Sequence, residues 1–234
     1  MQKNEICLSP TERLEDMNID GLMVVQDERL YRFTSDSVLL SRFAQAKTGD
    51  YVADFCAGSG IVGLHFYALN RHEKKRLKVV LFEMQKPLHD LSKKSIAYNG
   101  FEDVFTAEHC KIQEIPAVYH EAFSLVLCNP PYERGGFDNE TPEKAICRKE
   151  ITINLEEIAL AAAKALKYGG RLALINRADR VAEVCYTLKK VGLEVKKMQF
   201  VSGKEGAKPY LLMVEAVKGG KPTCEILPTI ANEK

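Results

Sequence analysis

Residues 51–63 read Tyr-Val-Ala-Asp-Phe-Cys-Ala-Gly-Ser-Gly-Ile-Val-Gly. A short apolar run leads into a glycine-rich loop, and an apolar segment follows, so the stretch predicts a strand, a tight turn and a helix. From Tyr51 onward, short apolar runs alternate with helical stretches along the rest of the chain. This alternation is typical of βαβ units and predicts an α/β fold with a largely parallel sheet.

Seven apolar runs predict the strands of this sheet. Only residues 202–209 separate the last two runs, which is too short for a crossover helix, so these strands should pair antiparallel. A seven-stranded mixed sheet with an antiparallel terminal β-hairpin resembles the class I methyltransferase fold, whereas an NAD-binding Rossmann domain ends on a parallel strand. The expected strands span 51–56, 77–83, 104–109, 122–128, 170–176, 193–201 and 210–217, and the expected helices span 61–70, 87–99, 154–167 and 179–190.

Residues 1–50 are predicted to form an N-terminal extension that caps the ligand site, and residues 51–234 to form the main domain. Apolar runs at 22–26 and 30–33 flank three polar residues and predict a small hairpin. Thr34 or Ser35 can then begin a helix that continues to Gln45. A short helix is also expected over Thr11–Met17.

The composition limits the kinds of partner. Lys and Arg total 33 against 32 for Asp and Glu, so any contact with nucleic acid must come from local patches. Seven scattered Cys without a C-x-x-C pair argue for free thiols and against a zinc site. The five His share no metal-ligand spacing, so no metal is expected. Without a signal peptide or a long apolar run, the protein is expected to be cytoplasmic.

The glycine loop satisfies the pattern G-x-G-x-x-G, which fits either NAD or S-adenosylmethionine. Asp54 separates these two readings, because a carboxylate would repel a pyrophosphate but suit the cationic methionine end of S-adenosylmethionine. Glu83 ends the next predicted strand and is placed to bind ribose hydroxyls in either case. A purely structural alternative also stays open, in which Asp54 caps the helix that follows a tight turn.

A second motif, Asn129-Pro-Pro-Tyr132, follows the buried apolar run 123–128. Two prolines end a strand because neither can donate a ladder hydrogen bond. The motif therefore presents an amide, a stiff backbone and an aromatic ring at the carboxyl edge of the sheet, where open α/β sheets bind ligands. The Asn129 side-chain oxygen and the Pro130 carbonyl can accept the two N–H bonds of a planar amine, and Tyr132 can stack on a base.

The two motifs together resemble those of amino-methyltransferases that act on adenine N6 or glutamine N5. Further stretches resemble the bacterial tRNA1(Val) adenine-N6 methyltransferase family, and the likeness extends over residues 20–222. It implies S-adenosylmethionine as the cofactor, tRNA as the partner, and an anticodon-loop adenine as the methyl acceptor. These stretches are 33–40 (Phe-Thr-Ser-Asp-Ser-Val-Leu-Leu), 146–152 (Ile-Cys-Arg-Lys-Glu-Ile-Thr) and 209–222 (Pro-Tyr-Leu-Leu-Met-Val-Glu-Ala-Val-Lys-Gly-Gly-Lys-Pro).

The resemblance also implies a set of site residues. Methyltransferases of this fold often carry Asp after the third strand, where it touches the cofactor adenine, but here the matching stretch is His109-Cys-Lys111. Cys110 is expected at that place, and adenine binding is expected to depend on backbone groups and apolar packing. The implied cofactor-binding residues are Asp54, Cys56, Gly58, Gly60, Glu83, Cys110 and Asn129, and the implied catalytic residues are Asn129, Pro130 and Tyr132.

Five basic residues in loops at the carboxyl edge of the sheet are candidates for phosphate contacts. Other functions remain open: methylation of a glutamine amide in protein, methylation of DNA adenine, or RNA binding without catalysis. The glutamine enzymes usually add an N-terminal helical domain, for which the first twenty residues leave little room. The basic candidates are Arg134, Arg148, Lys149, Lys204 and Lys208.

Overall fold

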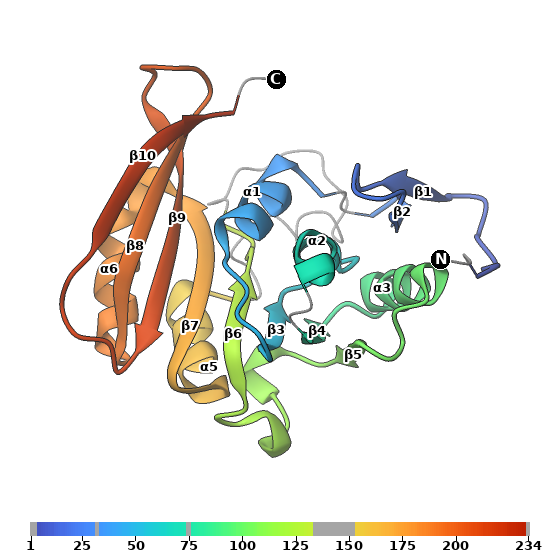
Figure 1. Ribbon diagram of the computed structural model, residues 1–234, viewed down its shortest axis with the longest axis horizontal. Coiled ribbons are helices and arrows are strands. Elements are labelled where there is room, and N and C mark those ends of the chain that lie inside the picture. Colours follow the sequence, from blue (N-terminus) through green and yellow to red (C-terminus); the bar gives the residue numbers. More distant parts are fainter. Residues whose placement is uncertain (1–3, 31–32, 74–75, 133–152, 233–234) are drawn as a thin grey trace.

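The structure is a computed structural model, and it describes residues 4–30, 33–73, 76–132 and 153–232. Its centre is a mixed sheet with the strand order β10-β8-β9-β7-β6-β3-β4-β5 (Figure 1). Within this sheet only β9 runs antiparallel to its neighbours. The strands are β3 (Tyr51–Phe55), β4 (Lys78–Glu83), β5 (Phe105–His109), β6 (Phe123–Cys128), β7 (Leu166–Arg177), β8 (Leu193–Ser202), β9 (Pro209–Lys218) and β10 (Glu225–Ala231).

Helices cover both faces of the sheet, as the alternating pattern predicts. One apolar core contains residues of α5 and α6, and the other contains residues of α1 and α2 (Figure 1). The helices are α1 (Ser35–Phe43), α2 (Ile61–Asn70), α3 (Lys86–Asn99), α5 (Leu155–Ala165) and α6 (Val181–Lys190), and short 3₁₀ turns span Arg71–Glu73, Ile112–Glu114, Ala117–Tyr119 and Ala178–Arg180.

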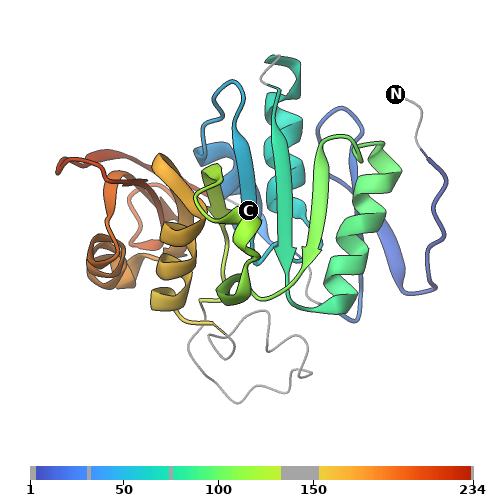
Figure 2. The ribbon, with the colours of Figure 1, turned by 90° about the horizontal axis from the view of Figure 1, so that it is seen from below.

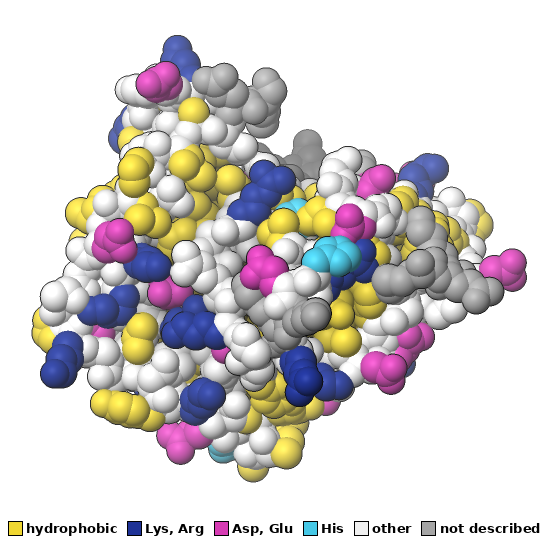
Figure 3. All heavy atoms as spheres, in the orientation of Figure 1, with side chains coloured by type: hydrophobic (Ala, Val, Ile, Leu, Met, Phe, Trp, Pro, Cys, Tyr) yellow, Lys and Arg dark blue, Asp and Glu magenta, His cyan; other side chains and the backbone are white. Residues whose placement is uncertain are grey.

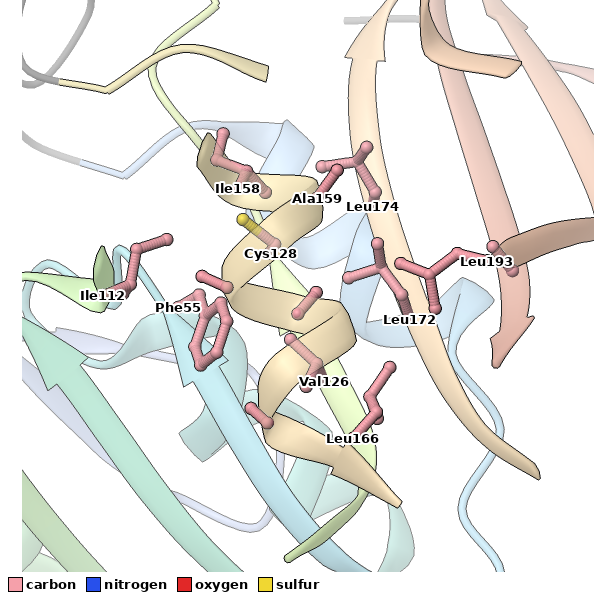
Figure 4. Packing of buried hydrophobic residues seen from close by; sticks show 14 of the residues in the cluster. Phe55, Ile112, Val126, Cys128, Ile158, Ala159, Leu166, Leu172, Leu174 and Leu193 are labelled. Atoms are coloured by element: carbon pink, nitrogen blue, oxygen red, sulfur yellow. The ribbon is translucent and has the colours of Figure 1, made fainter. Parts of the chain in front are cut away.

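The two cores follow from side-chain alternation along the central strands. In β3, Val52 belongs to the core beneath α1 and α2, whereas Phe55 belongs to the core beneath α5. Figure 4 shows Phe55 and Cys128 pointing toward α5, where Ile158 lies against the sheet. Because both faces are buried, these strands read as continuous apolar runs rather than alternating ones. In Figure 2 the arrowheads of the central strands point to the same edge of the sheet.

The sheet has eight strands, one more than the sequence predicts. The additional strand, β10, lies parallel to β8 at the edge, and the two strands shift register between Leu227 and Ile230. Pro228 lies within that shift. Proline lacks a backbone N–H, so it is tolerated in an edge strand or at a bulge but makes the segment unlike a strand in sequence.

The N-terminal extension pairs differently from the prediction. β1 (Glu12–Asp16) and β2 (Met23–Asp27) form an antiparallel pair. The predicted helix over 11–17 is therefore wrong, and β2 pairs with β1 along its length. The predicted hairpin between 22–26 and 30–33 falls partly on residues 31–32, which lie outside the described residues. Side chains of α3 bind the other edge of β2, because the Val25 N–H donates to Ser95 Oγ at 2.9 Å. A tertiary contact of this kind leaves no mark in the local sequence.

A buried histidine joins α1 to α2. The Ser41 hydroxyl donates to the Val38 carbonyl at 2.8 Å, so His65 Nδ1 donates to Ser41 Oγ at 2.7 Å. Burial, and secondarily the charge of Arg42, lower the pKa of His65 to about 4. The histidine is therefore neutral in the folded protein at neutral pH.

Replacing this histidine, His65→Gln, is expected to flatten the pH dependence of stability. Between about pH 6.5 and 4 the unfolded chain binds a proton at His65 that the folded protein does not bind, so the free energy of unfolding falls with falling pH. Each unit of pKa difference contributes about 1.4 kcal/mol. Urea unfolding of both proteins at pH 5 and pH 7 tests this. The contributions of the carboxylates to the pH dependence are common to both proteins and cancel in the comparison. An equal change in the free energy of unfolding between pH 5 and pH 7 in both proteins would contradict the conclusion that the buried His65 is neutral.

Candidate active site

A cavity opens at the carboxyl ends of the parallel strands, where the sequence places both motifs. It encloses about 1110 Å³, including its open mouth. Four strand ends, the start of α1 and the connection after β5 contribute its walls. The described residues that line it include Phe33, Thr34, Asp36, Ser37, Cys56, Gly58, Ser59, Phe82, Glu83, Met84, Cys110, Lys111, Ile112, Asn129, Pro130, Pro131 and Tyr132.

The glycine loop needs its glycines for two different reasons. Gly58 and Gly60 have φ values of +58° and +88°, which only glycine adopts without strain. A Cβ on Gly60 would lie 2.8 Å from Leu81 Cδ1, and a Cβ on Gly63 would lie 2.7 Å from Leu81 Cδ2. The last two glycines therefore let α2 pack closely on β4. A Cβ on Gly58 would meet nothing within 4 Å, so its backbone faces open space at the cavity.

Asp54 lies beneath the loop and does not line the cavity. Its side chain is completely buried, and Oδ2 accepts a hydrogen bond from the Gly63 N–H at 2.8 Å. Gly60, the N-cap of α2, has no side chain to perform this function. Asp54 therefore caps α2 from β3, as the structural alternative expects, and its other oxygen, Oδ1, is buried without a hydrogen-bond partner among the described residues. Burial raises its pKa to about 7.

Glu83 does line the cavity, at the end of β4. Oε2 accepts from the Gly58 N–H and Oε1 accepts from the Gln85 N–H, both at 2.8 Å. These bonds fix the carboxylate between the glycine loop and the start of α3. Burial raises the pKa of Glu83, and the backbone donors oppose that shift. Each oxygen keeps a second lone pair that can accept a hydrogen bond from a ribose hydroxyl.

The cavity walls combine a carboxylate with a mainly apolar surface. Beyond Glu83, the wall is mainly apolar and is formed by Phe82, Met84, Leu88 and Ile112. Cys110, which follows β5, also lines the cavity. Burial is the main cause that raises the pKa of its thiol, so the group is a neutral, weak donor. An apolar wall of this kind is suited to a planar ring, and the Glu83 oxygens are suited to hydroxyl donors.

The Asn129-Pro-Pro-Tyr132 segment also lines the cavity, and α1 binds both of its polar ends. The Asn129 Nδ2 group donates to Ser37 Oγ at 3.1 Å. The Tyr132 hydroxyl donates to Asp36 Oδ2. Asp36 and Ser37 belong to the family-like stretch 33–40, but they are not among the site residues that the sequence predicts. Only contacts across more than 90 positions of the chain reveal them.

Two of the five basic residues predicted to contact phosphate lie in the part of the chain that the structure describes. Lys204 and Lys208 are exposed in the connection from β8 to β9, at the same edge of the sheet as the cavity, but neither lines it. Acidic, basic and apolar side chains are intermixed on the face that Figure 3 shows, in keeping with the formal net charge of +1. The other three candidates, Arg134, Arg148 and Lys149, lie outside the described residues.

Two further features concern only the part of the chain that the structure describes. No group of three or more His, Cys, Asp or Glu side chains there could hold a metal ion. None of its helices is long and apolar enough to cross a membrane.

Two solved structures share this architecture. A predicted O-methyltransferase from Agrobacterium tumefaciens superposes with a TM-score of 0.66 at 20% identity, covering 84% of this chain and 86% of its own. Pyrococcus horikoshii TYW2, solved in complex with MeSAdo, gives a TM-score of 0.62 at 16% identity, covering 91% and 73%. The fold is therefore that of the class I methyltransferases.

The chain belongs to the family of methyltransferase small domains, whose model matches residues 34–203. It is an S-adenosylmethionine-dependent methyltransferase. One curated relative is the tRNA1(Val) (adenine(37)-N6)-methyltransferase of Shewanella sediminis, which is 23% identical over 181 residues, covering 76% of this chain and 72% of the relative. The matched region includes both motifs and the helix α1 that contacts the second of them.

Proposed function

We propose that this enzyme transfers a methyl group to the exocyclic N6 of an adenine in tRNA, at position 37 of the anticodon loop. The observation that carries the proposal is that Asn129, Pro130 and Tyr132 line the same cavity as Gly58 and Glu83. One cavity thus combines acceptors for a planar amine with a nucleoside-binding wall. The name of the Shewanella relative supports adenine 37 in tRNA as the substrate.

The chemistry requires that a poor nucleophile be correctly oriented. S-adenosylmethionine supplies a methyl group on a sulfonium, which is open to attack by a nitrogen lone pair. An adenine amine shares its lone pair with the ring, and two accepted N–H bonds favour a pyramidal nitrogen. The Asn129 oxygen and the Pro130 carbonyl can accept those bonds, so positioning and electrostatics provide the rate without a dedicated base.

The target base must leave its stack to reach the cavity, and two features favour this step: the Tyr132 ring and the single-stranded loop of the substrate. An aromatic ring that stacks on a base contributes about 1–3 kcal/mol. A base in a single-stranded loop leaves its stack at lower cost than one in a duplex. Lys204 and Lys208, exposed at the same edge of the sheet, are suited to phosphate contacts and would make binding salt-dependent.

The direct test is methylation of bulk tRNA lacking this modification, with labelled S-adenosylmethionine, followed by nucleoside analysis. The expected product is N6-methyladenosine, and cleavage of the labelled tRNA is expected to place it in the anticodon loop. Total protein and duplex DNA serve as parallel substrates. Label in glutamine or in DNA would replace the tRNA assignment, and labelled tRNA without N6-methyladenosine would overturn the choice of atom.

RNA binding without catalysis is the alternative from another class of function. It is tested by calorimetry with S-adenosylmethionine, since a degenerate site would release no heat. The fixed position of Glu83, held by two backbone donors, and the apolar wall beside it favour a binding-competent site.

A further inference from the structure

The first turn of α1 lies beside the Asn129-Pro-Pro-Tyr132 motif in the cavity. Asp36 and Ser37 both line the cavity, and Ser37 is only 3% exposed. Their partners, Tyr132 and Asn129, lie 96 and 92 positions later in the chain. The extension before the sheet therefore contacts each polar end of the acceptor motif directly.

The contact with Ser37 selects which end of the Asn129 amide faces the acceptor. An amide carries an oxygen that accepts and an NH2 group that donates. The NH2 group donates to Ser37 Oγ at 3.1 Å, so the oxygen is the end left for a ligand. An incoming amine is a donor, and a reversed amide would set two donors against each other. The Ser37 hydroxyl gives the NH2 group an acceptor in a buried corner and so stabilises the productive orientation.

The contact with Asp36 holds the ring of Tyr132. The phenol hydroxyl donates to a carboxylate oxygen, and bonds to a charged acceptor are roughly twice as strong as neutral ones. The ring is thus held at both ends, by the chain at Cα and by Asp36 at the hydroxyl. A ring with a fixed plane can bind a flat base with less loss of conformational entropy.

We propose that Ser37 and Asp36 are positioning residues for methyl transfer, Ser37 by orienting the Asn129 amide and Asp36 by fixing the Tyr132 ring. This inference rests on the proposed function, because it takes the ligand at these groups to be a planar amine. Neither residue contacts the reacting atoms in this scheme, and each acts through its partner.

Ser37→Ala is expected to lower kcat by about 10- to 100-fold, because a small misplacement of a reacting group has effects of this size. The dissociation constant for S-adenosylmethionine and the melting temperature should change little. Ser35→Ala is the matched control for the Asn129 contact, since Ser35 lies two positions earlier and is exposed. Its hydroxyl accepts from Asn232 Nδ2 at 3.1 Å and donates a long bond of 3.4 Å to Asp36 Oδ1. Ser37→Thr keeps the hydroxyl and should restore part of the rate.

A double-mutant cycle separates positioning from a general structural effect. In the Asn129→Ala background, Ser37→Ala should change kcat by less than about twofold, because its partner is already absent. In the same way, Asp36→Ala is expected to raise the KM for tRNA, because the Tyr132 ring is no longer held, and this effect should disappear in the Tyr132→Phe background. The proposal would be overturned if Ser37→Ala lowered kcat equally in the wild-type and Asn129→Ala backgrounds. A wild-type kcat for Ser37→Ala would overturn it as well.

A measurement without turnover keeps this inference separate from the proposed function. With ¹⁵N-labelled asparagine, the side-chain signals of Asn129 are identified by their loss in Asn129→Ala. They should shift in Ser37→Ala and stay in place in Ser35→Ala. If the wild-type enzyme methylates no tRNA, the proposed function fails while this spectrum still tests the contact. Unshifted signals in Ser37→Ala would refute the contact itself.

Discussion

Asn129→Ala is expected to lower the rate of methyl transfer by about 10²- to 10³-fold, the usual cost of removing one preorganised group from the transition state. The Asn129 side-chain oxygen would accept a hydrogen bond from the adenine amine. This bond strengthens as the attacking nitrogen gains positive charge. Single-turnover assays with labelled S-adenosylmethionine and tRNA measure the loss. The dissociation constant for S-adenosylmethionine should change only a few-fold, because the glycine loop and Glu83 stay in place.

Asn129→Asp is the matched comparison, since it keeps an oxygen acceptor of the same reach. It should retain more activity than Asn129→Ala, with the Ser37 hydroxyl now donating to the carboxylate instead of accepting. Full activity of the alanine variant would refute the mechanism. Loss of S-adenosylmethionine binding in that variant would instead assign Asn129 mainly to the cofactor.

Arg171→Met is expected to destabilise the fold by about 3–5 kcal/mol, the typical cost of leaving a buried charge without its partner. Arg171 Nη2 lies 2.9 Å from Asp50 Oδ2, and both side chains are 6% exposed. Arg171 Nη1 also donates to the Gln45 carbonyl at 2.7 Å. The arginine thus ties β7 to the segment that enters β3. Urea unfolding monitored by circular dichroism measures the change.

Two variants make this stability test specific. Arg13→Met breaks an ion pair with Glu28 in which the side chains are 65% and 51% exposed, and it should cost no more than about 1 kcal/mol. Arg171 Nη1 also lies 3.4 Å from Glu215 Oε2, so Arg171→Met leaves two carboxylates without their cation. Asp50→Asn combined with Arg171→Met removes one of these two charges and should be less destabilising than Arg171→Met alone. A loss for Arg171→Met no larger than that for Arg13→Met would contradict the role assigned to the buried pair.

Local patterns were sufficient for the core of the fold. The predicted strands at 51–56, 77–83 and 122–128 each differ from β3, β4 and β6 by one residue at one end only. The predicted antiparallel pairing of the last two apolar runs is confirmed by β8 and β9. These elements are buried on both faces, so their apolar runs stand out from the polar loops between them.

The elements that the sequence mispredicted are held by partners rather than by their own pattern. β1 carries charged residues on both faces and pairs with β2 at the periphery. β10 is largely exposed and contains Pro228. Weakly buried strands lack the continuous apolar run of the central ones, so propensity alone does not identify them.

The sequence by itself determined the class of chemistry. The glycine loop, Glu83 and Asn129-Pro-Pro-Tyr132 each stand at the end of a buried strand, and parallel strands bring their carboxyl ends to one edge. Only the tertiary structure decided how those groups are held. It placed Asp54 beneath α2 as a cap, and it brought Asp36 and Ser37 onto the acceptor motif. The reason is that hydrogen-bond partners distant in the chain are selected by packing, which no local pattern encodes.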